Sequence, residues 1–117
     1  AIRTTLEGLR LRHPQGRLVV AMEPRSNSMR LGAHADQLAP SLAEADVVVF
    51  LARPELPWDA QRVIQAMRSE AYAEASVDAL LTRLSHVVAP GDTVVFMSNG
   101  GFEAAPRRFT QAWSERA

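Results

Sequence analysis

Two polar loops hold the residues of this chain that are best suited to bind a ligand. Each follows an apolar, strand-like run, 18–22 in the first case and 93–97 in the second. The loop residues are Arg25, Ser26 and Asn27 in the first loop and Ser98, Asn99, Gly100 and Gly101 in the second. A guanidinium group suits bidentate binding of a carboxylate or phosphate, and paired glycines let backbone amides approach a ligand closely. These residue types favour recognition of an anion or a peptide.

The two loops can form one site only if their strands are neighbours. In an open parallel sheet, ligands bind beyond the carboxyl ends of the strands, where the winding reverses. We therefore expect Arg25 and Ser98 to face one crevice. The alternative is structural: local turns made by serine and asparagine, and glycines that turn the chain into its last helix.

No residue is assigned to catalysis or to a metal. No nucleophile has a base near it in the sequence, and His13, His34 and His86 are not at metal-ligand spacing. The sequence contains neither a Walker phosphate loop nor a G-x-G-x-x-G motif. The chain is therefore expected to recognise a ligand rather than to transform one.

Composition limits the class of protein further. A chain of 117 residues is the size of one domain, and thirteen basic residues balance thirteen acidic ones, which argues against a nucleic-acid partner. The absence of cysteine excludes disulfides and suits a reducing compartment. The apolar run 47–52 is too short to span a bilayer. We expect a cytoplasmic domain with no nucleic-acid or membrane partner.

The elements that must position the loops alternate along the chain. Strands are expected at 17–22, 47–51, 71–73 and 93–97, and helices at 4–12, 36–45, 60–67, 77–88 and 103–116. The segment 70–74 would also permit a helix, because it consists of alanine, glutamate and one tyrosine. The expected N-caps are Thr4 or Thr5, Asp59 and Ser76.

Continuous apolar runs are typical of strands that are buried on both faces of a parallel sheet. The alternation of strands and helices predicts an α/β fold with right-handed crossovers. We expect a Rossmann-like three-layer sandwich with helices on both faces. Its sheet should be mostly parallel, with about four strands in the order 3-2-1-4.

Several motifs resemble the C-terminal domain of the Mur ligase family. They are the block EPRSNSMRLG at 23–32, the pair WD at 58–59 and the block MSNGGF at 97–102. The opening AIRTTL resembles the start of this domain just after its usual Asp-x-x-His-His-Pro-Thr stretch, which this chain lacks. The resemblance covers essentially the whole chain. The ten-residue block is typical of the branch that reuses murein peptides.

This resemblance implies an ATP-dependent ligase that joins the tripeptide L-Ala-γ-D-Glu-meso-diaminopimelate to UDP-N-acetylmuramate in murein recycling. In such a ligase, ATP converts a carboxylate to an acyl phosphate, which the peptide amine attacks. A central domain holds ATP and Mg²⁺, and an N-terminal domain holds the UDP-sugar. Residues 1–117 would be the C-terminal domain of this three-domain enzyme, which presents the peptide and is inactive alone.

The resemblance also implies roles for individual residues. Arg25 and Pro24 match the end of an Asp-Asn-Pro-Arg motif that holds diaminopimelate in a related ligase, whereas Met22 and Glu23 replace its first two residues. The residues implied to bind peptide carboxylates are Arg25, Asn27 and Ser98, assisted by Ser26, Asn99 and the amides of Gly100 and Gly101. Two alternatives stay open: a Mur ligase domain for a single amino acid, and a stand-alone anion-binding module.

Overall fold

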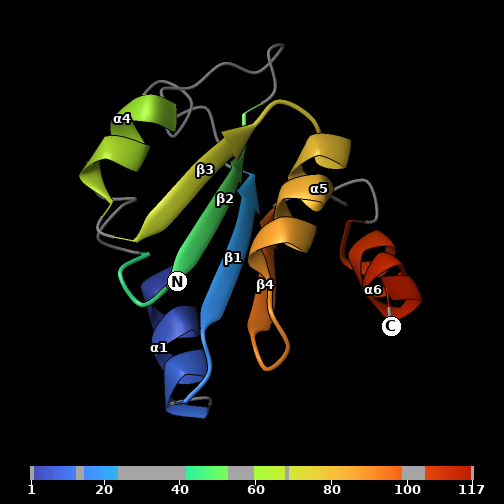
Figure 1. The fold of residues 1–117 in the computed structure, drawn as a ribbon. Helices are drawn as coiled ribbons and strands as arrows, with labels where there is room; N and C mark the ends of the chain where they lie inside the picture. The colour runs from blue at the N-terminus through green and yellow to red at the C-terminus, as the bar shows by residue number, and fades with distance from the viewer. Residues whose placement is uncertain are drawn as a thin grey trace.

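The computed structural model describes residues 2–12, 15–23, 42–52, 60–67, 69–98 and 105–116. Figure 1 shows the elements that they form. The helices are α1 (Ile2–Arg12), α4 (Ala60–Ala66), α5 (Val77–Val87) and α6 (Ala105–Arg116). The strands are β1 (Leu18–Glu23), β2 (Val47–Leu51), β3 (Glu70–Glu74) and β4 (Thr93–Ser98).

The four strands form one parallel sheet in the order β3-β2-β1-β4, as predicted. β1 pairs with β2 on one side and with β4 on the other, with Val20 opposite both Val48 and Val95. From β1 the chain winds first to β2 and β3, and then returns past β1 to β4. The winding therefore reverses between β1 and β4.

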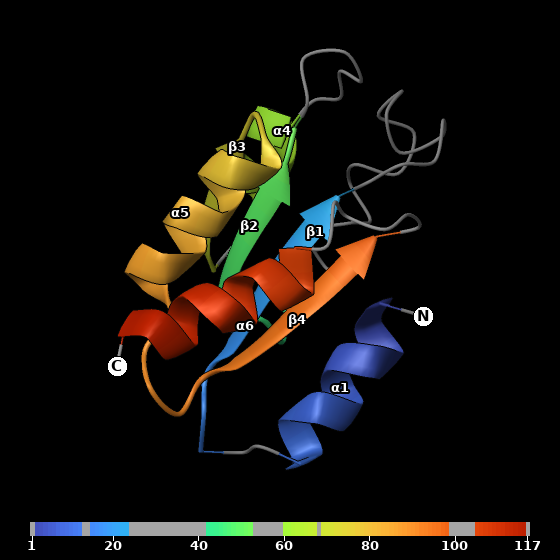
Figure 2. The same cartoon turned by 90° about the vertical axis from the view of Figure 1, so that its right-hand side faces the viewer.

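Helices cover both faces of the sheet, which gives the expected three layers (Figure 2). Alternate strand residues supply two separate cores. One core joins Val19 and Ala21 to Leu80 and Leu84 of α5 and to Phe109 of α6. The other core joins residues of opposite parity, such as Val20 and Phe50, to α1 and to the partly buried side of α4. Every residue of β1 and β2 is buried, because both faces of these central strands are covered.

The edge segment 70–74 is a strand, so the helical alternative for it is wrong. Its residues pair in register with β2, from Val47 opposite Glu70 to Leu51 opposite Glu74. Backbone pairing with a buried neighbour outweighs the weak local preference of alanine and glutamate.

Several expected boundaries differ from the structure. α1 begins at Ile2, so Thr4 and Thr5 lie inside the helix and neither caps it. Residues 42–44 form a turn, in which the Ala45 amide donates to the Leu42 carbonyl at 3.0 Å, so a helix does not continue to residue 45. The remainder of that expected helix, 36–41, and Asp59 lie outside the described residues. The Ser76 cap is confirmed: its side chain accepts from the Ala79 amide at 3.1 Å.

Candidate functional site

The ends of β1 and β4 meet at one edge of the sheet. We call this the carboxyl edge, formed by the last residues of the four strands, which are Glu23, Leu51, Glu74 and Ser98. Glu23 and Ser98 are opposite each other in the parallel register of β1 and β4. This pair lies where the winding reverses, which is the usual ligand position in an open α/β sheet. The expectation that the two strands are neighbours is confirmed.

Of the residues predicted to bind ligand, only Ser98 is placed, and only its backbone is described. Ser98 is the last residue of β4, and its backbone lies opposite that of Glu23. The side chain of Ser98 lies outside the described residues, as do Arg25, Ser26, Asn27, Asn99, Gly100 and Gly101. Their convergence on one crevice therefore stays a prediction. It rests on the adjacency of the strands from which the two loops leave.

Glu23 is a residue whose position the sequence analysis missed. The sequence predicts that the first strand ends at residue 22, but Glu23 is the last residue of β1 and only 5% exposed. Among the residues that the structure describes, it is the one charged side chain in the buried class. Strand alternation places it on the same face as Val19 and Ala21, toward α5 and α6. A carboxylate after five apolar residues gave no local signal of burial.

The opposite, amino edge of the sheet is tied together by charged side chains. Arg10 donates to the Asp46 carboxylate at 2.7 Å and to the carbonyls of Glu44 and Gly16 at 2.7 and 2.8 Å. The same carboxylate accepts from the Leu18 amide at 2.7 Å. Burial alone would raise the pKa of Asp46, but the hydrogen bonds from Arg10 and Leu18 outweigh it and lower that pKa. These contacts hold α1 against the starts of β1 and β2.

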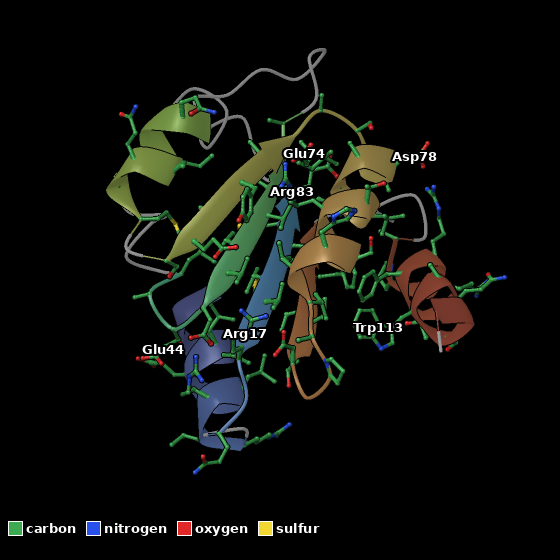
Figure 3. The ribbon with its side chains drawn as sticks, in the orientation of Figure 1. Arg17, Glu44, Glu74, Asp78, Arg83 and Trp113 are labelled. Atoms are coloured by element: carbon green, nitrogen blue, oxygen red, sulfur yellow. The ribbon has the colours of Figure 1, made fainter. Side chains whose placement is uncertain are left out.

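A second ion pair at the amino edge joins the starts of β1 and β4. Arg17 donates two hydrogen bonds to Asp92, at 2.8 and 3.3 Å, and a third to the Val87 carbonyl at 2.7 Å. Arg17 lies low in the sheet in Figure 3, at the end opposite Glu74. Both charged clusters of the amino edge thus lie away from Glu23 and Ser98. Their role is to fix the strands rather than to bind a ligand at the carboxyl edge.

A third cluster lies at the carboxyl end of β3. Glu74 accepts from Arg83 of α5 at 3.1 Å, and the guanidinium of Arg83 lies 4.5 Å from the centre of the Tyr72 ring (Figure 3). A hydrogen bond to Glu70 raises the pKa of Tyr72, and burial adds to the shift. β3 is separated from β1 by β2, so this cluster fixes α5 on the sheet and is not beside Ser98.

The described residues contain neither a cluster suited to a metal ion nor a membrane-spanning helix. No group of three or more histidine, aspartate or glutamate side chains is arranged to hold a metal among the described residues. No helix there is both long enough and apolar enough to cross a bilayer. Of the three histidines, His86 is exposed on α5, while His13 and His34 lie outside the described ranges.

Comparison with known proteins agrees with this architecture. Over its whole length, the chain is 36% identical to the UDP-N-acetylmuramate–L-alanyl-γ-D-glutamyl-meso-2,6-diaminoheptandioate ligase of Escherichia coli. It spans about a quarter of that relative's length (26%).

Two crystal structures are similar over 95% of the chain. One is a domain assigned to the corresponding ligase of Haemophilus ducreyi, with a TM-score of 0.79, 30% identity and 80% of that chain covered. The other is a murein peptide ligase of Psychrobacter arcticus, with a TM-score of 0.82, 34% identity and 24% of that chain covered. The family model described as "Mur ligase, glutamate ligase domain" matches residues 1–100. The parallel sheet and the match to this family model show that the chain belongs to the Mur ligase family and corresponds to the C-terminal domain of its members.

Proposed function

We propose that residues 1–117 are the peptide-binding C-terminal domain of a longer, three-domain cytoplasmic ligase. The reaction proposed for the whole enzyme joins L-alanyl-γ-D-glutamyl-meso-diaminopimelate to UDP-N-acetylmuramate at the expense of ATP, in the reuse of murein peptides. Membership of the Mur ligase family supports this proposal, as does the name of a relative that is 36% identical and about four times longer.

The observation that carries the proposal is the pairing of β1 with β4. The register puts Glu23 opposite Ser98, so the two polar loops leave the sheet from adjacent positions at the point where the winding reverses. We assign peptide binding to Arg25, Ser26 and Asn27 of the first loop and to Ser98, Asn99, Gly100 and Gly101 of the second.

The chemistry of the assigned residues suits a peptide that ends in a dicarboxylic amino acid. At neutral pH such a peptide carries several carboxylates, and an arginine fork binds a carboxylate through two parallel hydrogen bonds. Hydroxyl, amide and backbone N–H donors add neutral contacts that orient the peptide. The domain contributes by positioning the peptide amine and, when it closes over the site, by excluding water from an activated carboxyl group.

ATP and Mg²⁺ are assigned to another part of the proposed enzyme. The sequence of this chain has no Walker phosphate loop, and its described residues hold no acidic cluster of the kind that binds a divalent ion. No chemical step of the proposed reaction is therefore assigned to residues of this domain.

The proposal is tested by Arg25→Ala in the full-length enzyme. One charge-assisted hydrogen bond contributes about 1.5–3 kcal/mol, so kcat/KM for the tripeptide should fall between about 10-fold and about 150-fold. Arg107→Ala is the matched control, because Arg107 is exposed on α6 and its loss should leave the kinetics unchanged. Unchanged tripeptide kinetics in the Arg25 variant would remove this residue from the site.

The substrate is tested separately on the wild-type enzyme. Ligation of the tripeptide, but not of free L-alanine, to UDP-N-acetylmuramate is the expected result. Preference for a free amino acid would instead make the enzyme a ligase that adds single residues. If the gene encodes no upstream nucleotide-binding domain, the chain would be a stand-alone binding module and the ligase proposal would fail.

A further inference from the structure

Glu23 is a buried carboxylate at the carboxyl edge of the sheet, and no role has yet been assigned to it. The residue is 5% exposed, and it is the one charged residue that is buried among those the structure describes. It ends β1 opposite Ser98 of β4, where the winding of the sheet reverses. Its negative charge therefore lies at the point from which the two loops assigned to peptide binding leave the sheet.

The face of the sheet that carries Glu23 is apolar. Strand alternation puts Glu23 on the same face as Val19 and Ala21, and α5 and α6 cover this face (Figure 2). The core between the sheet and these two helices consists of aliphatic and aromatic side chains. A charge beside such a core is screened little by water and salt. Its field therefore reaches farther into an adjoining site than the field of an exposed carboxylate does.

Two other carboxylates near this edge have structural roles. Glu74 accepts from Arg83 at 3.1 Å, and β2 separates its strand from β1. Asp78, at the exposed start of α5, pairs with Arg108 of α6. Glu23 also takes part in a polar interaction within the chain. An ionised carboxylate offers about four acceptor positions, so such an interaction leaves room for a further donor.

The peptide of the proposed reaction carries a cation at the end where its carboxylates are. It ends in diaminopimelate, a dicarboxylic acid with two amino groups. One amino group forms the peptide bond, and the other remains as an ammonium group on the far carbon, beside a carboxylate. The residues assigned to peptide binding include one cation and neutral donors but no anion. They match the carboxylates of the peptide and supply no counter-charge for its far ammonium group.

We propose that Glu23 determines specificity: its buried negative charge selects peptides whose last residue keeps a free ammonium group. This inference rests on the proposed function, because it names the part of the peptide that the site distinguishes. Charge–charge attraction falls only with the inverse of distance, and it is strong where water is excluded. Glu23 therefore favours the ammonium group even where the two groups are not in direct contact.

Two peptides that differ by this ammonium group test the proposal on the wild-type, full-length enzyme. One is the diaminopimelate tripeptide, and the other contains 2-aminopimelate in its place, which keeps both carboxylates but lacks the far amine. Calorimetry with UDP-N-acetylmuramate and a non-hydrolysable ATP analogue present gives both dissociation constants. The diaminopimelate peptide should bind about 10-fold more tightly, as expected for one charge-assisted interaction. Equal dissociation constants would overturn the inference.

Substitutions test whether the charge of Glu23 causes this preference. Glu23→Gln removes the charge at almost constant size and should abolish most of the 10-fold preference, whereas Glu23→Asp keeps the charge and should keep most of it. A loosened fold would weaken the binding of both peptides alike and leave their ratio unchanged. The matched control is Glu74→Gln, the same substitution at the end of β3, and it should retain the wild-type ratio. An undiminished preference in Glu23→Gln would overturn the inference.

Salt provides a test that does not depend on the folding of any variant. Raising the salt concentration from about 0.1 M to about 1 M shortens the Debye length from about 10 Å to about 3 Å. A preference caused by a buried charge should change less than about twofold in the wild-type enzyme, because salt does not reach that charge. Loss of the preference at about 1 M salt would assign it to exposed charges and refute the role of Glu23.

The ligase assay on the same wild-type preparation separates this inference from the proposed function. An active ligase that binds both peptides equally would refute the selection by Glu23 and leave the proposed function intact. An enzyme that prefers the diaminopimelate peptide but does not join it to UDP-N-acetylmuramate would refute the function and leave the selection intact. Binding of neither peptide would refute both.

Discussion

The ion pair between Arg17 and Asp92 offers a quantitative test of how the sheet is held together. The two residues are 75 positions apart and immediately precede β1 and β4, the strands whose adjacency defines the candidate site. The Asp92 side chain is only 6% exposed, and it also accepts from the Ala89 amide at 2.9 Å. Removing the charge of Asp92 should therefore weaken the contact between the starts of β1 and β4.

Asp92→Asn keeps an acceptor for the Ala89 amide but removes the charge that Arg17 binds. Exposed ion pairs contribute about 0.2–1 kcal/mol, and hydrogen bonds to charged groups about 1.5–3 kcal/mol. Arg17 is 45% exposed while Asp92 is nearly buried, so solvent screens the pair only in part. We expect the variant to lose about 1–2 kcal/mol of unfolding free energy at neutral pH.

A double-mutant cycle isolates the interaction itself. Arg17→Met, Asp92→Asn and the double variant are compared with the wild-type chain by urea denaturation, followed by circular dichroism. The coupling free energy should be about 1 kcal/mol, because each single substitution removes the same pair of hydrogen bonds. A coupling free energy below about 0.3 kcal/mol would mean that the pair contributes no more than additive surface changes do.

The pH dependence of the Asp92→Asn difference gives an independent check. Burial works to raise the pKa of Asp92, but the hydrogen bonds from Arg17 and Ala89 outweigh it, so the pKa lies below its ordinary value of 3.8. A carboxyl whose pKa is lower in the folded state stabilises the fold above its unfolded pKa. That contribution disappears as the pH falls through the folded pKa. The wild-type advantage should be full near neutrality and shrink below about pH 4. An equal advantage at both ends of this range would refute the assignment.

Two further predictions follow from the backbone of the same fold. A Cβ on Gly16 would lie 2.9 Å from the Gly91 carbonyl oxygen, so Gly16→Ala should lower the unfolding free energy by about 1–3 kcal/mol. In the control Gly8→Ala, the added Cβ meets nothing within 4 Å inside α1, so this variant should raise the unfolding free energy by about 0.5–1 kcal/mol. Thermal unfolding of both variants shows whether one substitution destabilises the fold and the other stabilises it. Ser76→Ala removes the acceptor of the Ala79 amide at the start of α5 and should lower the unfolding free energy, measured by urea denaturation, by about 1 kcal/mol. Ser76→Thr keeps a capping hydroxyl and should lower it much less.

The central strands could be predicted because burial on both faces of a sheet leaves a local trace in the sequence. The runs 18–22 and 47–51 are apolar at every position, which is the pattern of strands that are covered on both faces of a sheet. The start of α5 could also be predicted, since the serine cap and the apolar stripe lie close together in the sequence. The start of α1 could not be predicted, because its first turn begins ahead of the two threonines that could have capped it.

The candidate site, too, was predictable from the sequence in some features and not in others. The types of its loop residues and their position after strands come from the sequence alone, as does the resemblance to Mur ligases. The burial of Glu23 could not be predicted from the sequence, because nothing near a single glutamate at the end of a strand indicates how deeply the helices on that face cover it.

The sequence by itself determined the alternation of strands and helices, the two polar loops and the family, because periodicity and motifs are properties of neighbouring residues. Only the tertiary structure decided that Glu23 lies opposite Ser98, that residues 70–74 form an edge strand, and that Arg17 binds Asp92. The physical reason is that a local pattern shows how much of a segment must be buried but not which segment covers it. That choice depends on hydrogen-bond partners and side-chain packing contributed by distant parts of the chain.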